Sequence, residues 1–235
     1  MKKTLVLSVI INILFILFGG YIIHKKGGFN YLKQNSAKLL EIEQDYSLYY
    51  KTKRSIFEIM PYDTNKIIFL GNSITNFCDW HELFGNENII NRGINGDVIN
   101  GVIDRSDVIL SSSPKKIFLM IGTNDLAEGN TIEKIISNYE RLLILIKEKS
   151  PRTKLYLQSI LPTLNDQRRK NDDIIAINKS LIDLTEKYGF TYVNLFDILK
   201  TERNELDTIY SFDGLHLNGK GYLKLKKEIE QYVNN

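Results

Sequence analysis

From residue 66 onward, short apolar runs alternate with longer segments whose apolar residues recur at helical spacing. The runs are Lys66–Leu70, Asn88–Asn91, Lys116–Ile121, Lys154–Ile160 and Phe190–Leu195. Runs of this kind are typical of strands that are buried on both faces of a sheet. Strands that alternate with helices run parallel and are joined by right-handed crossovers. We therefore predict an α/β fold with a parallel sheet of five strands.

Two segments between these runs carry the apolar stripe of a long helix. One stripe extends from Ile132 to Ile146, and the other extends from Ile174 to Tyr188 and is followed by Gly189, which is placed to end its helix. The intervening loop at 160–170 is polar and charged, so we expect it to be mobile.

Three residues that can take part in chemistry or in close turns directly follow expected strands. They are Ser73, Gly93 and Gly122. Ligands of parallel α/β sheets bind outside the carboxyl ends of the strands. We therefore expect these three positions to face one crevice.

The N-terminus carries the longest apolar segment of the chain. Thr4 to Ile23 has no charged residue, and its 20 residues match the ~30 Å thickness of a bilayer core. A cleaved signal peptide is the alternative, although its apolar region spans only ~7–15 residues and ends at a small-residue site. We expect an uncleaved anchor in a single-pass cell-membrane protein, with the domain extracellular; cleavage after Gly19 or Gly20 would give a secreted protein. Lysines flank both ends, so charge does not set the orientation.

The expected domains are the anchor or signal segment at 1–26, a juxtamembrane helical region at 27–62 and the globular domain at 63–235. The juxtamembrane region carries an apolar stripe that Lys53 interrupts and Pro61 ends. Its members are Leu39, Ile42, Tyr46, Tyr49, Ile56 and Met60. We expect this stripe to pack on the domain, with pairing of two chains as the alternative.

The charge balance bears on possible partners. The net charge is +3, but residues 1–26 hold four lysines and no acidic residue, which leaves 27 basic and 28 acidic residues in the remainder. Such a balance gives no electrostatic reason to expect nucleic-acid binding. Cys78 is the only cysteine, so no internal disulfide forms.

A nucleophilic serine requires a base, and histidine is the usual one near neutral pH. His24 abuts the apolar N-terminal segment, and His81 is expected in the same helix as Ser73, roughly 12 Å further along it. His216 remains, and Asp213 precedes it by three residues, close enough to hold the imidazole in the required tautomer. Taken alone, this Asp-x-x-His pattern is equally typical of a surface turn.

Acyl transfer also requires donors where negative charge develops on the carbonyl oxygen. Gly93 leaves its backbone N–H accessible, Asn124 offers an amide N–H, and the Ser73 N–H lies at the start of a helix. Glycine and asparagine are also common in ordinary loops. The occurrence of all these donors at neighbouring strand ends favours a catalytic site.

Four segments resemble the signature blocks of one enzyme family. The segments FLGNSIT, INRGINGD, MIGTND and DGLHLN, in this order, are similar to those of the SGNH hydrolases, also called GDSL-type esterases. The resemblance covers about residue 64 to the C-terminus. It implies a flavodoxin-like three-layer α/β/α fold and no metal or other cofactor.

The resemblance also implies roles for individual residues. Ser73 is the nucleophile, His216 the base and Asp213 its orienting acid, while Gly93 and Asn124 join the Ser73 amide in the oxyanion hole. The family usually has aspartate before the serine, where this chain has Asn72.

The residues of the second and third blocks are similar to those of one branch of the family. This branch contains platelet-activating-factor acetylhydrolase-like proteins and bacterial carbohydrate O-acetylesterases. We therefore expect hydrolysis of a short-chain ester, such as acetyl on a carbohydrate, with the membrane contacted only through the N-terminal helix. A lysophospholipase or thioesterase is the alternative within the family. A noncatalytic carbohydrate-binding surface protein is the alternative outside it.

Other reactive or bulky residues have structural explanations. We expect Cys78 to lie buried in the helix after Ser73, and Phe77 and Trp80 to belong to the core. Arg92 and Arg105 are expected in surface or structural ion pairs, with contact to polar groups of a substrate as the alternative. Three scattered histidines and one cysteine show no metal-ligand spacing.

Overall fold

The computed structural model describes residues 46–60 and 63–234, together with the single positions 12, 21 and 25. It divides into two units, Met1–Tyr46 and Ser47–Asn235, and the sheet and its helices belong to the second. The expected anchor and the juxtamembrane positions 27–45 lie outside the described residues, apart from those single positions. None of the helices that the described residues form has both the length and the apolar character of a bilayer span.

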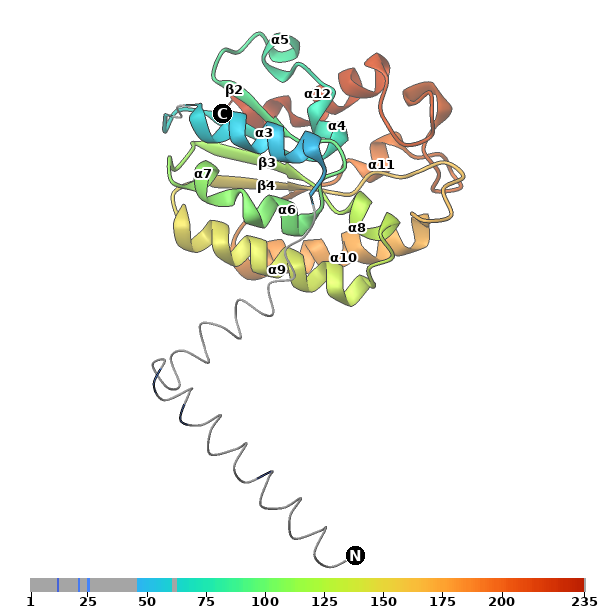
Figure 1. Ribbon diagram of the computed structural model, residues 1–235. Coiled ribbons are helices and arrows are strands. Elements are labelled where there is room, and N and C mark those ends of the chain that lie inside the picture. Colours follow the sequence, from blue (N-terminus) through green and yellow to red (C-terminus); the bar gives the residue numbers. More distant parts are fainter. Residues whose placement is uncertain (1–11, 13–20, 22–24, 26–45, 61–62, 235) are drawn as a thin grey trace, which may run out of the picture. The chain divides into compact units, whose positions relative to one another are not determined.

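The centre of the domain is a parallel sheet with the strand order β2-β1-β3-β4-β5 (Figure 1). The strands are β1 (Ile67–Gly71), β2 (Ile89–Gly93), β3 (Lys116–Met120), β4 (Lys154–Gln158) and β5 (Thr191–Val193). All five predicted strands are confirmed, with bounds that differ mainly at their ends. β1 and β3 are buried along their whole length, as expected for strands covered on both faces.

Helices cover both faces of the sheet, which gives three layers. One face packs against α6 (Ile99–Asp104), α7 (Ser106–Leu110), α9 (Ile132–Lys149) and α10 (Asn171–Tyr188). The other packs against α4 (Ser73–Asn76), α5 (Trp80–Phe84), α11 (Phe196–Leu199) and α12 (Gly219–Asn234). The short elements α8 (Thr123–Ala127) and η1 (Thr208–Tyr210) complete the domain after β3 and before α12. The flavodoxin-like three-layer prediction is confirmed in this form.

The two long predicted helices are present as α9 and α10. The Thr131 side chain accepts a hydrogen bond from the Lys134 N–H and so caps the start of α9. Gly189 ends α10 in the left-handed conformation, with φ of 73°, as its position in the sequence predicted.

The helix α3 (Leu48–Ile59) belongs to the same compact unit as the sheet, so this unit begins at Ser47 and not at residue 63. Packing of this helix on the domain is confirmed, but the buried face is not the predicted stripe. Tyr50 and Phe57 are buried, whereas Tyr49, Ile56 and Met60 remain 37–43% exposed.

Specific partners select this face of α3. The Tyr50 hydroxyl donates to the Gly101 carbonyl at 2.7 Å, and the Arg92 guanidinium lies 4.6 Å from the centre of the Phe57 ring. The predicted stripe and the buried row are adjacent on the helix. The periodicity of the apolar residues alone therefore did not distinguish the two rows.

The loop at 160–170 was expected to be mobile, but hydrogen bonds hold it in place. The Thr163 hydroxyl donates to the Arg169 carbonyl at 2.8 Å, and the Leu164 N–H donates to the Gly214 carbonyl at 2.8 Å. Thr163 and Arg169 are both buried. The loop therefore connects the turn before His216 with the region around α8.

Phe57→Ala tests the observed packing of α3. It should lower the free energy of unfolding by about 3 kcal/mol, because it empties a site that is only 7% exposed. Ile56→Ala, the matched control on the neighbouring row, should cost less than about 1 kcal/mol. Urea unfolding of both variants measures the difference, and equal costs would contradict the packing described.

Candidate active site

Ser73 lies at the point where β1 ends and α4 begins. Asn72 caps α4, since its Oδ1 accepts a hydrogen bond from the Ile74 N–H at 3.1 Å. The Tyr222 hydroxyl on α12 donates to the Ile74 carbonyl at 2.7 Å and ties α4 to another helix of the same layer. Ser73 itself is only 9% exposed.

The structure brings Ser73, His216 and Asp213 together. Ser73 Oγ lies 2.9 Å from His216 Nε2, and His216 Nδ1 lies 2.6 Å from Asp213 Oδ2. When Nδ1 carries the proton and donates to the carboxylate, Nε2 is free to accept the serine proton. This is the geometry that a hydrogen-bonded nucleophile and base require.

Asp213 is held in its ionised form. Burial raises its pKa, but hydrogen bonds from the His216 ring and from the N–H groups of His216 and Leu215 outweigh this effect. The pKa of Asp213 is therefore held well below its usual range. Gly214 adopts φ of 80° and allows the tight turn that places these N–H groups around the carboxylate.

The other described histidine lies elsewhere. His81 belongs to α5, a helix separate from α4, so the predicted single helix through Ser73 and His81 is wrong. His81 is about half exposed and lies 3.8 Å from Glu82. His24 lies outside the described residues.

Cys78 lies in the bend between α4 and α5, and not inside a helix as predicted. It is buried as expected, and burial together with the charge of Asp79 raises the pKa of its thiol to about 12. A thiol with such a pKa is a poor nucleophile at neutral pH.

Asn124 lies in α8 with its side-chain amide in a defined orientation. One N–H donates to the Asp97 carbonyl at 3.0 Å, and Oδ1 accepts a hydrogen bond from Arg169 Nη2 at 3.2 Å. An amide nitrogen carries two donors. The second N–H of Asn124 has no partner among the described residues and is available to a substrate oxygen.

Gly93 does not offer a free donor. Its N–H donates to Asn91 Oδ1 at 2.8 Å, and Gly93 is buried. A Cβ atom at this position would lie 2.3 Å from the Asn76 nitrogen, so the absence of a side chain lets β2 approach the nucleophile helix. This hydrogen bond contradicts the predicted role of Gly93 as an oxyanion-hole donor.

Gly96, in the same loop, has the accessibility that was expected of Gly93. It is exposed, with φ of 76°, and lies in a turn closed by a hydrogen bond from the Asp97 N–H to the Ile94 carbonyl. Within the described part of the chain, its own N–H has no hydrogen-bond partner. Gly96 was not among the predicted site residues, although a second glycine in NRGINGD is itself a signal for a turn with positive φ.

A buried ion pair supports the loop that carries Gly96. Arg105 Nη2 lies 2.8 Å from Asp97 Oδ2 and donates to the Gly71 carbonyl at 3.2 Å, so it joins the loop to the end of β1. Burial raises the pKa of Asp97 to about 6, against the opposing effect of Arg105. The prediction of a structural ion pair is confirmed for Arg105.

The aromatic residues near Ser73 divide between core and site. Trp80 is buried, as predicted, and stacks on Phe69 with 4.2 Å between ring centres. Phe77 is 51% exposed and its ring centre lies 4.9 Å from that of His216, so its assignment to the core was wrong. Phe77 is the C-cap of α4, and its ring lies against His216 instead of the core.

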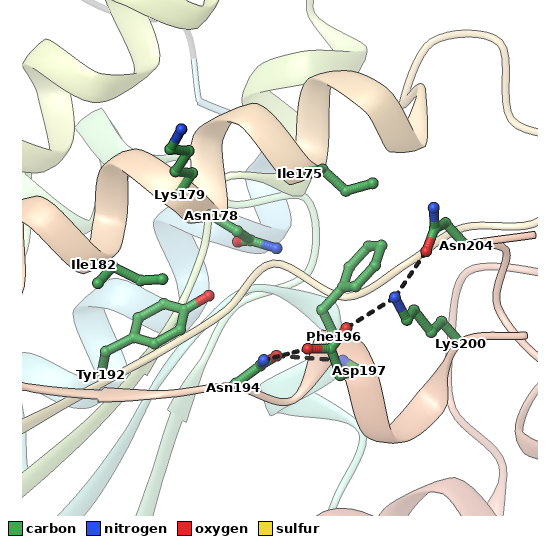
Figure 2. A pocket seen from close by; sticks show the side chains of 10 residues that line it. All are labelled: Ile175, Asn178, Lys179, Ile182, Tyr192, Asn194, Phe196, Asp197, Lys200 and Asn204. Atoms are coloured by element: carbon green, nitrogen blue, oxygen red, sulfur yellow. Dashed lines mark hydrogen bonds and ion pairs between the residues drawn. The ribbon is translucent and has the colours of Figure 1, made fainter. Parts of the chain in front are cut away.

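A pocket of about 310 Å³ lies beside β5 and α10, and it contains none of the predicted site residues (Figure 2). Several of its polar side chains are already engaged in hydrogen bonds or ion pairs. Lys200 Nζ lies 3.0 Å from Asp197 and donates to Asn204 at 2.8 Å, while Asn178 bonds to the Ile160 backbone. We therefore assign no chemistry to this pocket. No group of three His, Cys, Asp or Glu side chains able to hold a metal ion occurs among the residues that the structure describes.

The GDSL-like Lipase/Acylhydrolase family model matches residues 69–224, which is more than half of the chain. The protein therefore belongs to this family. It is accordingly a serine hydrolase that acts on ester bonds. The resemblance found in the four signature segments is confirmed.

Individual relatives are similar at modest identity. The chain is 29% identical over 176 residues to the platelet-activating factor acetylhydrolase IB subunit alpha2 of Rattus norvegicus, covering 71% of this chain and 75% of that protein. It is 27% identical over 205 residues to an N-acylneuraminate cytidylyltransferase of Escherichia coli, covering 86% of this chain and 47% of that protein. The chain thus spans about half the length of this second relative.

Solved structures share the fold. One from Streptococcus pneumonia, described as a platelet activating factor, is 29% identical with a TM-score of 0.71 and covers 86% of this chain and 97% of its own. An acetylxylan esterase from Geobacillus stearothermophilus is 15% identical with a TM-score of 0.59 and covers 74% of this chain and 95% of its own. The latter likeness concerns the fold alone.

Buried carboxyl groups near the site should make stability depend on pH. Burial raises the pKa of Asp125 to about 7, although the Ile99 N–H donates to its carboxylate. Because this folded-state pKa lies above the unfolded value near 3.9, Asp125 contributes stability below about pH 4 that is lost as the pH rises through 7.

Asp125→Asn should therefore reduce the fall in thermal midpoint between pH 5 and pH 8, by roughly 5 °C relative to the unaltered protein. Asp183→Asn, an exposed control on α10, should leave the fall unchanged. Calorimetry at both pH values measures the thermal unfolding midpoint of each variant. An Asp125→Asn variant with the full pH dependence would contradict this account.

Proposed function

We propose that the protein is an esterase in which Ser73 is the nucleophile, His216 the base and Asp213 the acid that orients it. The observation that carries the proposal is the continuous hydrogen-bonded path from Ser73 Oγ through both ring nitrogens of His216 to Asp213. Serine activation by a base that a third group orients is the usual arrangement for acyl transfer.

The reaction proceeds in two steps. Ser73 Oγ attacks the acyl carbonyl while its proton passes to His216 Nε2, and His216 then returns this proton to the departing alcohol oxygen. Water, deprotonated by the same nitrogen, attacks the carbonyl of the acyl-enzyme, and the proton then passes from His216 to Ser73 Oγ as the bond to the acyl group breaks and the acid leaves. Asp213 stays ionised throughout and stabilises the imidazolium.

The developing oxyanion binds to three donors in this proposal. They are the Ser73 N–H, the second N–H of Asn124 and the Gly96 N–H, which replaces Gly93. The support is that none of the three donates to another group among the described residues, whereas the Gly93 N–H does. Preorganised donors of this kind stabilise charge that appears only in the transition state.

Asn72 is compatible with this mechanism. It keeps the capping hydrogen bond to the Ile74 N–H that an aspartate would also make. What it lacks is a negative charge beside the nucleophile. The triad acid is Asp213, so the chemistry does not depend on position 72.

The substrate that we propose is a short-chain ester, with acetyl on a carbohydrate as the leading candidate. A similar protein named for N-acylneuraminate, a sugar, and a fold neighbour named an acetylxylan esterase support a carbohydrate acceptor. Relatives named for platelet-activating factor support a lipid ester as the second candidate. The exposed Phe77 beside His216 provides an apolar wall that suits either an acyl chain or a sugar face.

We also propose that the segment from Thr4 to Ile23 holds the domain at the outer face of a cell membrane. The support is its length and lack of charge. Membrane fractionation of the full chain, beside one that begins at Gly28, tests this placement. Recovery of both chains in the supernatant would contradict it.

Ser73→Ala should abolish hydrolysis of p-nitrophenyl acetate, butyrate and octanoate, because it removes the attacking oxygen. The thermal unfolding midpoint should change little. Ser55→Ala on the exposed surface of α3 is the matched control and should keep full activity. Initial rates across the three esters also separate the candidates, since a preference for acetate supports the short-chain esterase and a preference for octanoate supports a lipid substrate.

Turnover that survives in Ser73→Ala would contradict the nucleophile assignment. Absence of turnover by the unaltered protein on all three esters, together with binding of acetylated oligosaccharides, would favour the noncatalytic alternative.

A further inference from the structure

Resting on the proposed function, we propose that Arg169 is a positioning residue that orients the Asn124 amide toward the oxyanion. Arg169 comes from the loop between β4 and α10, a long way in sequence from Asn124 in α8. It is only 7% exposed. Arg169 Nη2 donates to Asn124 Oδ1 at 3.2 Å, and Arg169 Nε donates to the Thr123 carbonyl at 3.1 Å.

The chemistry of the partners fixes which end of the amide faces the substrate. A guanidinium can only donate and a backbone carbonyl can only accept. Arg169 therefore takes the oxygen of Asn124, and the Asp97 carbonyl takes one N–H at 3.0 Å. A flipped amide would put donor against donor and acceptor against acceptor. The second N–H is thus the donor of the Asn124 side-chain amide that is left to meet a substrate.

The charge of Arg169 also strengthens this donor. A charge-assisted hydrogen bond to the amide oxygen draws electron density from the nitrogen, which makes its remaining N–H a better donor in a partly buried site. The third nitrogen of the guanidinium, Nη1, donates to Asp166 Oδ2 at 2.5 Å. This pair keeps the planar group aligned with the α8 backbone.

The Arg169 side chain donates to Thr123, Asn124 and Asp166, and none of its hydrogen bonds within the described part of the chain reaches Ser73 or His216. Its effect must therefore pass through Asn124. If Arg169 only stabilised the loop, its removal would weaken the enzyme equally with or without the Asn124 amide. If it orients Asn124, its removal matters only while that amide is present.

A double-mutant cycle on the full chain separates these cases, with kcat and KM measured on p-nitrophenyl acetate. Asn124→Ala should lower kcat by roughly 10²–10³-fold. Arg169→Met should lower kcat roughly 10–100-fold with KM nearly unchanged, as expected for loss of one charge-assisted hydrogen bond. In the Asn124→Ala background, Arg169→Met should cost less than about twofold.

Arg168→Met is the matched control, because Arg168 also lies near Asp166 but its side chain is 71% exposed. It should leave kcat within about twofold of the unaltered protein. Arg169→Lys keeps the charge without the planar fork and should lose less than Arg169→Met. It also serves if Arg169→Met does not fold.

Equal losses from Arg169→Met in both backgrounds would overturn the proposal and leave a structural role only.

A measurement that does not depend on activity keeps the test separate from the proposed function. In ¹⁵N-labelled Ser73→Ala protein, Arg169→Met should shift the side-chain amide signals of Asn124, whereas Arg168→Met should not. Unshifted Asn124 signals would overturn the proposal even if the protein hydrolyses no ester.

Discussion

The site depends on a close backbone approach at Gly71, the last residue of β1. In the parallel register Gly71 lies opposite Gly93 of β2 and Met120 of β3, so the three strands that carry the site end at the same level. A Cβ atom at Gly71 would lie 2.1 Å from the Met120 carbonyl and 2.4 Å from Thr75 Oγ1. Only glycine lets α4 start directly over the strand ends. The Gly71 carbonyl also accepts hydrogen bonds from the Ile94 N–H and from Arg105, which hold the neighbouring loop against it.

The other loops around the site are held in place by hydrogen bonds to one another. The loop that contains Gly96 and Asp97 holds Asn124 through the Asp97 carbonyl, and Arg169 holds the same side chain from the opposite end. The loop that contains Arg169 is also joined to the turn before His216, because the Leu164 N–H donates to the Gly214 carbonyl. The proposed nucleophile, base and oxyanion donors are thereby connected by hydrogen bonds, although they lie far apart in the sequence. Such preorganisation is what electrostatic catalysis requires.

Much of this arrangement could be predicted from the sequence, because its determinants are local. Apolar runs and helical stripes depend on burial patterns that the sequence displays directly, and they predicted all five strands together with α9 and α10. Ser73, Asn124 and the Asp213–His216 pair were predictable because they sit at strand ends or within a few residues of each other. What failed depended on individual side-chain contacts that the pattern of apolar residues does not display. The Gly93 N–H is taken by the Asn91 side chain, the Phe77 ring lies against His216, and Arg169 reaches Asn124 only through the fold of its loop. The choice of Tyr50 over Tyr49 likewise depended on an acceptor in α6.

The central claim is that His216 activates Ser73 as a nucleophile, and covalent labelling with a fluorophosphonate tests it most directly. The reagent phosphonylates an activated serine, so mass spectrometry of the intact protein should show a single adduct, and peptide mapping should place it on Ser73. Labelling should slow by several orders of magnitude in His216→Ala, while His81→Ala should label at the original rate. An adduct on another residue, or labelling of Ser73 at an equal rate without His216, would contradict the account.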